Sequence, residues 1–321
     1  MKDLVELAEV IEKEIGDLGY PRSPALLYDP IEYIMGLKAK RIRPLLVLMA
    51  CQLFDDDIER AVAPAIAIEV FHNFTLLHDD IMDKAPLRRG SLTVHEKWNS
   101  NIAILSGDVM MIQAYQLLAK VNSSNLKEVL DVFSKTAVEV CEGQQWDMDF
   151  ETQKNVNLIE YMKMIKYKTA VLLAASLQIG GIIGGANKEE QSQLYNFGIN
   201  MGIAFQLKDD LLDVFGKPKV FGKKLGGDIS ANKKTFLYLK SLELADNATK
   251  HKLEGYYMNN NSPELKVSLV KEIFKELNIQ QHTIDIMKSH YKKAMSCINA
   301  IKCDNKEPLI TFSNKLMERI S

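Results

Sequence analysis

Apolar residues recur at three- and four-residue spacing along most of the chain. This spacing is typical of helices that bury one face against a core. No convincing stretch alternates apolar and polar residues, and no Asn-Gly or Asp-Gly pair indicates a tight hairpin. The pattern predicts helices over residues 3–18, 31–53, 58–83, 102–121, 126–147, 158–183, 188–214, 234–254 and 264–320.

Glycine and proline fall mainly between these helices, in segments such as GYPRSP, VNSSN and GGANKEE. No change in composition marks a second domain, and a chain of 321 residues can bury a large core. We therefore expect an all-α fold in which residues 1–321 form a single domain, a bundle of long and mostly buried helices.

The charges of the chain are nearly balanced, with 40 basic and 42 acidic residues and a formal net charge of −2. Such a balance creates no general field for nucleic acid or an acidic membrane, so we expect no nucleic-acid partner. The apolar stretch from Ala170 is shorter than the roughly 20 residues of a membrane span and contains glycines, which favours a buried helix over membrane insertion. With an N-terminal segment unlike a signal peptide and no paired cysteines, this predicts a cytoplasmic protein.

Two similar acidic motifs, LHDDIMD at 77–83 and LKDDLLD at 207–213, each close an apolar helical segment. The first contains Asp79, Asp80 and Asp83, called here the first aspartate cluster, and the second contains Asp209, Asp210 and Asp213, the second aspartate cluster. Anions are unfavourable at the C-terminal end of a helix, and like charges one turn apart repel. A cation would relieve both costs, and Mg²⁺ commonly bridges carboxylates to substrate phosphates. The acidic trio Asp55 to Asp57 differs, because it precedes a helix and fits a capping role.

Basic residues near these motifs indicate direct phosphate binding. Arginine suits bidentate contact with phosphate, and lysine acts as a point charge. The residues in question are Lys40, Arg41, Arg43, Arg88, Arg89, Lys168, Lys223, Lys224 and Lys233. No P-loop and no GxGxxG pattern is present, so the phosphates are not predicted to belong to a nucleotide.

Read in order, the motifs KRxRP, ExxH, DDxxD, RRG, GQ, KT, FQxxDDxxD and GKxxGxD resemble those of the trans-isoprenyl diphosphate synthases of the short-chain type. The resemblance extends from about Lys40 to Thr235 and implies the isoprenoid synthase type I fold, with helices around a central cavity. It also implies a homodimer.

The resemblance implies a role for each matching residue. The two aspartate clusters would hold three Mg²⁺ ions on the diphosphate of an allylic substrate. Arg88, Lys168 and Lys233 would contact that diphosphate with Lys223 nearby, while Thr169 and Gln206 would lie near the developing carbocation and Gln144 and Asp147 near the metals. Lys40, Arg43, His72 and Arg89, called here the isopentenyl diphosphate residues, would bind the second substrate. A lone histidine such as His72 is otherwise usually a core residue.

The implied reaction is head-to-tail prenyl transfer by ionisation, condensation and elimination. An allylic diphosphate (dimethylallyl, geranyl or farnesyl) ionises, its cation alkylates isopentenyl diphosphate, and a proton is lost to the released diphosphate.

Product length should depend on the residues one to two turns before the first aspartate cluster. We call Phe71, Phe74 and Thr75 the floor, because the growing chain would stop there. The same aromatics are compatible with a purely structural place in the core. A bulky Phe74 favours a C20 product slightly over C15.

The alternatives are a class I terpene cyclase and a non-catalytic prenyltransferase subunit. A cyclase normally has a different second metal motif, and non-catalytic subunits usually lose aspartates or basic residues that are present here. Three departures from the family pattern stand out: Lys38-Ala39 and Asn232 occupy positions where many relatives have glycine, and the C-terminal KLMERIS lacks a basic tail.

Overall fold

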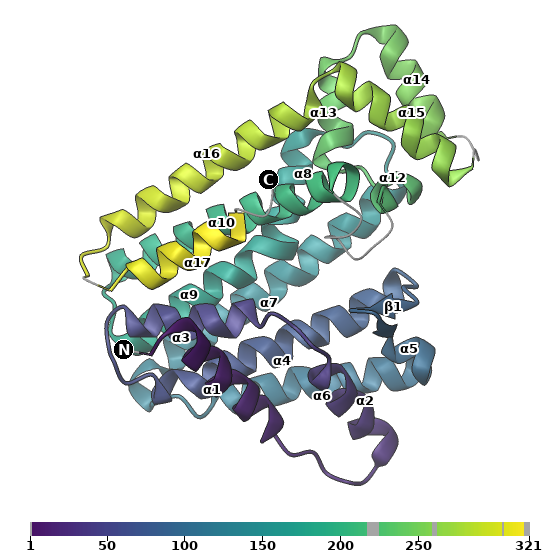
Figure 1. The fold of residues 1–321 in the computed structure, drawn as a ribbon. Coiled ribbons are helices and arrows are strands. Elements are labelled where there is room, and N and C mark those ends of the chain that lie inside the picture. The colour runs from purple at the N-terminus through teal and green to yellow at the C-terminus, as the bar shows by residue number, and fades with distance from the viewer. Residues whose placement is uncertain (1, 217–224, 259–261, 304, 318–321) are drawn as a thin grey trace. The chain divides into compact units, whose positions relative to one another are not determined.

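The computed structural model describes residues 2–216, 225–258, 262–303 and 305–317. Over these residues the chain is almost entirely helical, which confirms the all-α prediction (Figure 1). The helices are α1 (Leu4–Gly16), α2 (Ala25–Gly36), α3 (Ile42–Gln52), α4 (Glu59–Met82), α5 (Val94–Lys97), α6 (Ser100–Leu118), α7 (Ser123–Thr152), α8 (Leu158–Ile165), the π-helix η1 (Lys166–Ala170), α9 (Val171–Gly184), α10 (Lys188–Phe215), α12 (Gly227–Ser230), α13 (Phe236–Leu244), α14 (Asn247–Met258), α15 (Pro263–Glu276), α16 (Ile279–Ala300) and α17 (Glu307–Met317). Two short strands, β1 (Leu87–Arg88) and β2 (Ser91–Leu92), follow α4.

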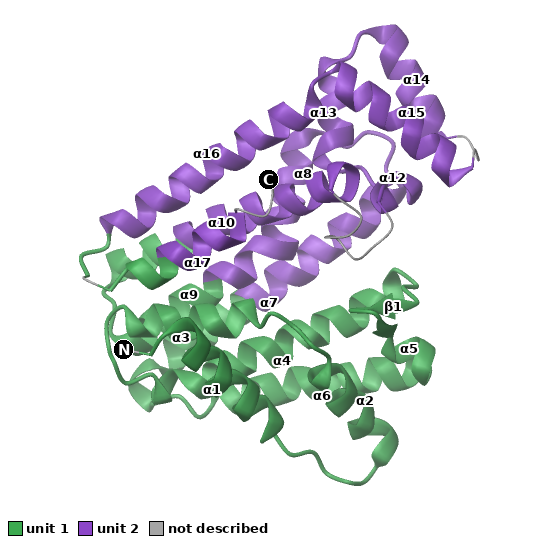
Figure 2. Cartoon of the chain, in the orientation of Figure 1, with its two compact units in different colours: residues 1–135, 175–195, 301–309 green, residues 136–174, 196–300, 310–321 purple. Residues whose placement is uncertain are grey.

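The chain divides into two compact units, coloured separately in Figure 2. Unit 1 comprises residues 1–135, 175–195 and 301–309, and unit 2 comprises residues 136–174, 196–300 and 310–321. The first aspartate cluster belongs to unit 1 and the second to unit 2. The single domain expected from composition stays a prediction.

Helix α4 forms the centre of unit 1. It packs against α1, α2, α3 and α6. Its residues from Ala61 to Phe71 are buried on nearly every side apart from Ala63, so the helix has no wide polar face. A helix that is apolar all round belongs in a core. The carboxylates at its C-terminal end are therefore fixed to a rigid, buried element.

Unit 2 contains most of α10, from Asn196 onward, and the segment from α8 to η1. α13 packs against α8, α15 and α16, and α12 packs against α15. Leu207 and Leu211 of α10 are buried, and Asp210 and Asp213 on the same helix meet the polar residues described below.

Several predicted helices are interrupted in the structure. The segment 31–53 breaks at residues 37–41 into α2 and α3, and the segment 264–320 contains α15, α16 and α17. Each break coincides with a left-handed residue or a loop that the apolar spacing does not reveal, such as Arg41 at φ 46° and Asn278 at φ 52°.

By length and hydropathy alone, α4 and the helical segment Leu158–Gly184 could each span a membrane. The structure buries 67% and 78% of their most apolar windows inside the protein, which is the behaviour of core helices. This agrees with the expectation for the apolar stretch from Ala170.

Helices α3 and α9 approach closely at a glycine. A Cβ added to Gly180 would lie 2.1 Å from the Val47 carbonyl oxygen and 2.9 Å from the Ala50 Cβ, so a side chain there would force the two helices apart. Gly255, in α14, has no heavy atom within 4 Å of the same added atom.

These two glycines predict opposite effects of the same substitution. We expect Gly180→Ala to destabilise the protein by roughly 1–3 kcal/mol, because overpacking outweighs the helix propensity of alanine. Gly255→Ala should instead raise stability by about 0.5–1 kcal/mol. Thermal melts of both variants beside the wild type measure the difference, and a stabilised Gly180→Ala would contradict the close approach.

Candidate active site

The first aspartate cluster lies where α4 ends in a Schellman motif. Lys84 adopts a left-handed φ of 51° just past the helix, and its N–H donates to the Ile81 carbonyl at 3.2 Å. The N–H of Ala85 donates to the Asp80 carbonyl at 2.9 Å. This pattern satisfies the last carbonyls of a helix and stops it sharply. It leaves Asp83 exposed, Asp79 half-buried and Asp80 only 2% exposed.

The β1–β2 hairpin carries Arg88 and Arg89. Arg88 pairs with Ser91, and the two residues of the turn, Arg89 and Gly90, have φ values of 53° and 78°. Two positive φ angles make a type I′ turn, whose twist suits a short hairpin. The expectation of no hairpin was wrong, because the turn uses Arg-Gly in place of the more common Asn-Gly. Tyr33 anchors the hairpin by donating its hydroxyl to the Leu92 carbonyl at 2.8 Å.

The hairpin directs Arg88 back to α4. Its Nε donates to Asp80 Oδ2 at 2.7 Å, and its Nη2 lies 2.7 Å from Asp80 Oδ1 and 3.4 Å from Asp79 Oδ2. The Nε contact is a charge-assisted hydrogen bond, and the Nη2 distances add ion pairs to both aspartates. Burial raises the pKa of Asp80, although its contact with Arg88 works in the opposite direction. Arg88 therefore compensates the most buried carboxylate of the cluster.

Arg43 and His72 also meet in unit 1, at 3.0 Å between Arg43 Nη1 and His72 Nε2. Because a guanidinium can only donate, His72 Nε2 must accept, and the neutral ring carries its proton on Nδ1. Burial, together with the charges of Arg43 and Arg89, holds the pKa of His72 well below its usual value. Arg43 Nε is buried and has no hydrogen-bond partner among the described residues. Lys40 is exposed. The isopentenyl diphosphate residues thus include a buried donor with spare capacity.

In unit 2, the π-helix η1 carries Lys168 and Thr169. The sequence predicted a continuous helix from 158 to 183, but residues 166–170 adopt the wider π-helical turn. Single π turns of this kind are frequent at functional sites. Two glycines allow neighbouring helices to touch it: a Cβ on Gly143 would lie 2.2 Å from Lys168 N, and one on Gly202 would lie 2.5 Å from Ala170 Cα. Gly143, the glycine of the GQ motif, therefore allows α7 to contact the backbone of η1 directly.

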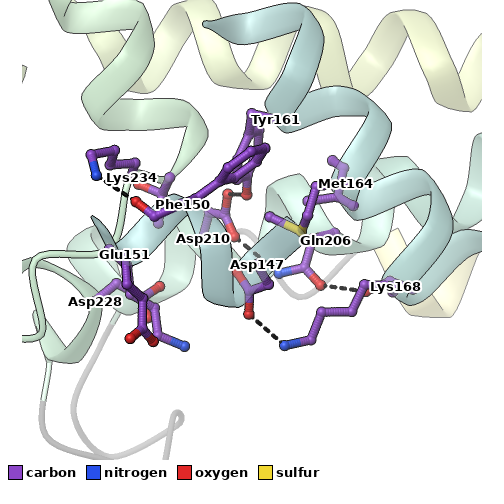
Figure 3. A pocket seen from close by; sticks show the side chains of 14 residues that line it. Asp147, Phe150, Glu151, Tyr161, Met164, Lys168, Gln206, Asp210, Asp228 and Lys234 are labelled. Carbon is purple, nitrogen blue, oxygen red and sulfur yellow. Dashed lines mark hydrogen bonds and ion pairs between the residues drawn. The ribbon is translucent and has the colours of Figure 1, made fainter. Parts of the chain in front are cut away.

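Polar side chains line a cavity of unit 2 that encloses about 650 Å³ of empty space, its open mouth included. Figure 3 shows Asp147, Lys168 and Gln206 along this cavity. Lys168 Nζ lies 2.6 Å from Asp147 Oδ2. Thr169 Oγ1 donates to Gln206 Oε1 at 3.0 Å, and Gln206 Nε2 donates to Asp210 Oδ1 at 3.0 Å. The residues expected near the carbocation thus form one chain of hydrogen bonds that ends on the second aspartate cluster.

Tyr161 completes this chain from α8, where its hydroxyl donates to Asp210 Oδ2. Burial raises the pKa of Asp210 to about 7 and that of Tyr161 well above its usual range. Asp210 is 3% exposed, whereas Asp209 is half-buried. As in the first cluster, the middle aspartate is the most buried of the three and accepts hydrogen bonds from protein side chains.

The loop after α12 places Lys233. Asp213 Oδ2 accepts from the Asp228 N–H at 3.1 Å, and the Asp228 carbonyl accepts from the Lys233 N–H at 2.9 Å. Asn232 has a left-handed φ of 58°, and its Oδ1 accepts from Lys266 Nζ. Glycine is favoured at such a φ and asparagine tolerates it better than most residues, which accounts for the asparagine in place of the family's glycine.

The aromatic floor residues lie on α4 within the core of unit 1. Phe71 is fully buried and Phe74 half-buried, with 5.6 Å between their ring centroids. Phe74 also contacts His78 edge-on at 4.8 Å, and Phe71 contacts Phe133 at 5.0 Å. Thr75 is half-buried and donates its hydroxyl to the His72 carbonyl at 2.8 Å.

Among the residues that the structure describes, no three acidic, histidine or cysteine side chains converge closely enough to hold a metal ion by themselves. Gln144 is half-buried on α7 beside Gly143. Lys223, predicted near the allylic diphosphate, and the last residues of KLMERIS lie outside the described residues.

Comparison with known sequences identifies the family. The sequence model of the polyprenyl synthetase family matches residues 24–277, which include both aspartate clusters and all the predicted site residues. The chain belongs to the polyprenyl synthetase family. It is thus a prenyltransferase, as its motifs predicted.

Individual relatives agree with this assignment. A geranylgeranyl diphosphate synthase of Methanosarcina mazei is 39% identical over 73% of this chain and 72% of its own length. A geranylfarnesyl diphosphate synthase of Natronomonas pharaonis is 34% identical over 74% of each chain. The crystal structure of a geranylgeranyl pyrophosphate synthase, 45% identical and aligned over 100% of both chains, gives a TM-score of 0.95. This likeness confirms the isoprenoid synthase fold.

Sequence reasoning did not single out several cavity residues of this polyprenyl synthetase. Tyr161 belongs to an apolar helical pattern, where a tyrosine is usually a core residue, so nothing in the sequence indicated its polar contact. Lys234 follows Lys233, but its Nζ donates to the Phe150 carbonyl. Asp228 belongs to the GKxxGxD motif, and that motif was the one signal that could have marked it.

The raised pKa of Asp210 predicts a pH-dependent stability in protein stripped of divalent cations. A carboxylate with a folded pKa of about 7 and an ordinary value of 3.8 is protonated in both states at low pH. Above pH 7 it is ionised in both states, and its burial then costs free energy of folding. We expect Asp210→Asn to raise the melting temperature relative to wild type at pH 8, with the gain shrinking as the pH falls toward 4.

Thermal melts in EDTA at several pH values measure this difference. The exposed Asp285→Asn in the same unit provides a matched control and should show no such trend. An Asp210→Asn gain that is equal at pH 5 and pH 8 would contradict the buried carboxylate.

Proposed function

We propose that the chain is a short-chain trans-isoprenyl diphosphate synthase that condenses isopentenyl diphosphate with an allylic diphosphate, with a C20 product favoured over C15. The reaction class follows from the family. The finer assignment is supported above all by two aspartate clusters of identical spacing, each accompanied by basic side chains. A class I cyclase would not need the second set of basic residues.

Three Mg²⁺ ions are the proposed cofactors, bound through the two aspartate clusters. The donor chemistry fits, because Mg²⁺ prefers oxygen ligands and keeps several waters, using one or two carboxylates together with substrate phosphates. When bound, the ions would neutralise the charge that develops on the leaving diphosphate.

The protein's own cations would share that task. Lys168 and Arg88 now contact Asp147 and Asp80, and each can extend a charged donor to a phosphate oxygen. Thr169 Oγ1 and Gln206 Oε1 present oxygen atoms suited to a neighbouring allylic cation. Leaving-group stabilisation of this kind is commonly the largest contribution to catalysis.

The isopentenyl diphosphate residues would bind the second substrate without metal. The buried Arg43 Nε without a partner among the described residues supports this proposal, because an unsatisfied donor in a core needs an acceptor. The neutral His72 would add a donor through its Nδ1 proton.

Product length would be set by the floor. Phe74 is the first phenylalanine before the cluster and its ring contacts Phe71 and His78, which would allow it to stop an elongating chain. Relatives named geranylgeranyl synthase support a C20 product. One relative is named for the next longer product, the C25 geranylfarnesyl diphosphate.

We also propose a cytoplasmic homodimer. The exposed face of α6 carries Ile104, Leu105 and Ile112, which are 45%, 56% and 58% exposed. Such a row of large apolar side chains on one helix suits a subunit interface.

Incubation with Mg²⁺, isopentenyl diphosphate and each of dimethylallyl, geranyl and farnesyl diphosphates tests the reaction. We expect elongation to geranylgeranyl diphosphate, read by chromatography of the dephosphorylated products. Asp79→Ala and Asp209→Ala should each lower the rate by roughly a hundredfold or more, because charge stabilisation is lost. Asp55→Ala, in the other acidic trio, serves as the control and should leave the rate unchanged. Failure to elongate any primer would refute the synthase, and a cyclic hydrocarbon would favour the cyclase.

The floor is tested by Phe74→Ala. Removing the ring opens space along α4, and we expect products longer by one or more isoprene units. Leu76→Ala, on the same helix and outside the floor, should leave the product distribution unchanged. An unaltered product from a folded Phe74→Ala protein would exclude Phe74 as the stop.

A further inference from the structure

Arg41 differs from its basic neighbours in the KRxRP motif. Lys40 is exposed, but Arg41 is only 5% exposed and its side chain turns into unit 1. The roles that the resemblance implies leave Arg41 without one. Its burial requires a structural explanation, since a guanidinium is almost never buried unless it is paired.

Arg41 is paired with a carboxylate that is equally buried. Its Nη1 lies 2.8 Å from Glu69 Oε1, and Glu69 is 1% exposed. Glu69 Oε1 also accepts from Asn73 Nδ2 at 3.1 Å, one turn along α4. A second carboxylate, Glu12 of α1, accepts from Arg41 Nε at 3.1 Å, but its side chain is 55% exposed. The Glu69 contact is therefore the strong one, because solvent screens the other.

The same guanidinium caps the preceding helix. Arg41 Nη2 donates to the carbonyls of Met35 and Leu37 at 2.5 and 3.4 Å, where α2 ends. The last carbonyls of a helix lack partners within the helix, and an arginine can satisfy them. One side chain thus ties residues 37–41 both to α2 and to α4.

The backbone of Arg41 is itself strained. It adopts φ 46° and ψ 39°, a left-handed conformation that costs a non-glycine residue free energy. α3 begins at the next residue, and the Arg41 carbonyl accepts from the Leu45 N–H at 3.1 Å. The strained residue therefore lies between Lys40 and Arg43 in the chain, and its conformation fixes the backbone positions from which their side chains extend.

The negative charge of Glu69 gives Arg41 a second effect, on the neighbouring Arg43. Glu69 and His72 are three residues apart on α4 and share one face of the helix, so Arg43, which contacts His72 at 3.0 Å, lies near the Glu69 carboxylate. Without Arg41, Glu69 would be a buried carboxylate in need of a partner. Arg43 is the nearby cation, and its binding to Glu69 would remove it from His72 and from substrate.

We propose that Arg41 is a positioning residue for isopentenyl diphosphate: by occupying Glu69 and fixing the backbone of residues 37–41, it keeps Lys40 and Arg43 available for the diphosphate. The inference rests on the proposed role of the isopentenyl diphosphate residues. It extends that role to two buried residues, Arg41 and Glu69, which would act through their contacts with other residues.

The test compares Arg41→Met, Arg41→Lys and the double variant Arg41→Met/Glu69→Gln. We expect Arg41→Met to raise the KM for isopentenyl diphosphate by roughly tenfold to a hundredfold, as expected for loss of one charged hydrogen bond. The KM for the allylic substrate should change little. The double variant, which removes both buried charges, should recover most of the loss, and Arg41→Lys should be intermediate. Lys38→Met removes an exposed charge from the same loop and is the control.

Calorimetric titration with isopentenyl diphosphate alone distinguishes this proposal from the proposed function. A wild type that elongates no primer would refute the synthase. If Arg41→Met remains folded by thermal melting and binds isopentenyl diphosphate as tightly as wild type, Arg41 has no positioning role. If the double variant is as impaired as Arg41→Met, the competition between Glu69 and Arg43 is refuted.

Discussion

Buried carboxylates impose the main constraint on this fold, because an ionised group taken out of water costs several kcal/mol unless a donor compensates it. Four carboxylates are buried among the described residues, and each has a donor from a separate segment. Side chains supply it for three of them, Arg88 for Asp80, Arg41 for Glu69 and Tyr161 for Asp210, and the Asp228 N–H supplies it for Asp213. Each pairing fixes an element that would otherwise be a surface connection. The hairpin after α4, the loop before α3 and the start of the α8 segment owe their orientation to these contacts.

The same constraint gives the aspartates of each cluster different tasks. The middle residue, Asp80 or Asp210, is nearly inaccessible and bonded to protein donors. The residue before it is half-buried in both clusters. A carboxylate held by an arginine or a tyrosine is a poor first ligand for a hydrated ion, whereas a less buried carboxylate is more accessible to one. In the proposed metal sites, the middle aspartate of each DDxxD motif would therefore serve mainly as an anchor, and the aspartate before it would be the better ligand.

The sequence predicted the long helices well because apolar spacing reports burial directly. It failed where geometry depends on a few backbone angles. The π turn that carries Lys168 has the same apolar pattern as an α-helix, and the hairpin at Arg89-Gly90 has strands too short to alternate. Candidate site residues were found through charge and motif order. Tyr161 was missed because nothing in an apolar helix indicates that its hydroxyl faces a carboxylate.

Left-handed residues other than glycine occur at four points beside predicted site residues: Arg41, Lys84, Arg89 and Asn232. Strain of this kind persists only where the surrounding contacts outweigh it, and it tends to collect at functional sites. Here the compensation differs each time. It comes from the buried ion pair for Arg41, the Schellman hydrogen bonds for Lys84, the hairpin for Arg89 and Lys266 for Asn232. A glycine could adopt these angles without such support, but it would also leave the loop free to adopt others. At Arg41 and Asn232 the side chain itself binds a neighbour, which restricts the loop to one conformation. The adjacent residues that we propose to bind phosphate would then be positioned before substrate arrives.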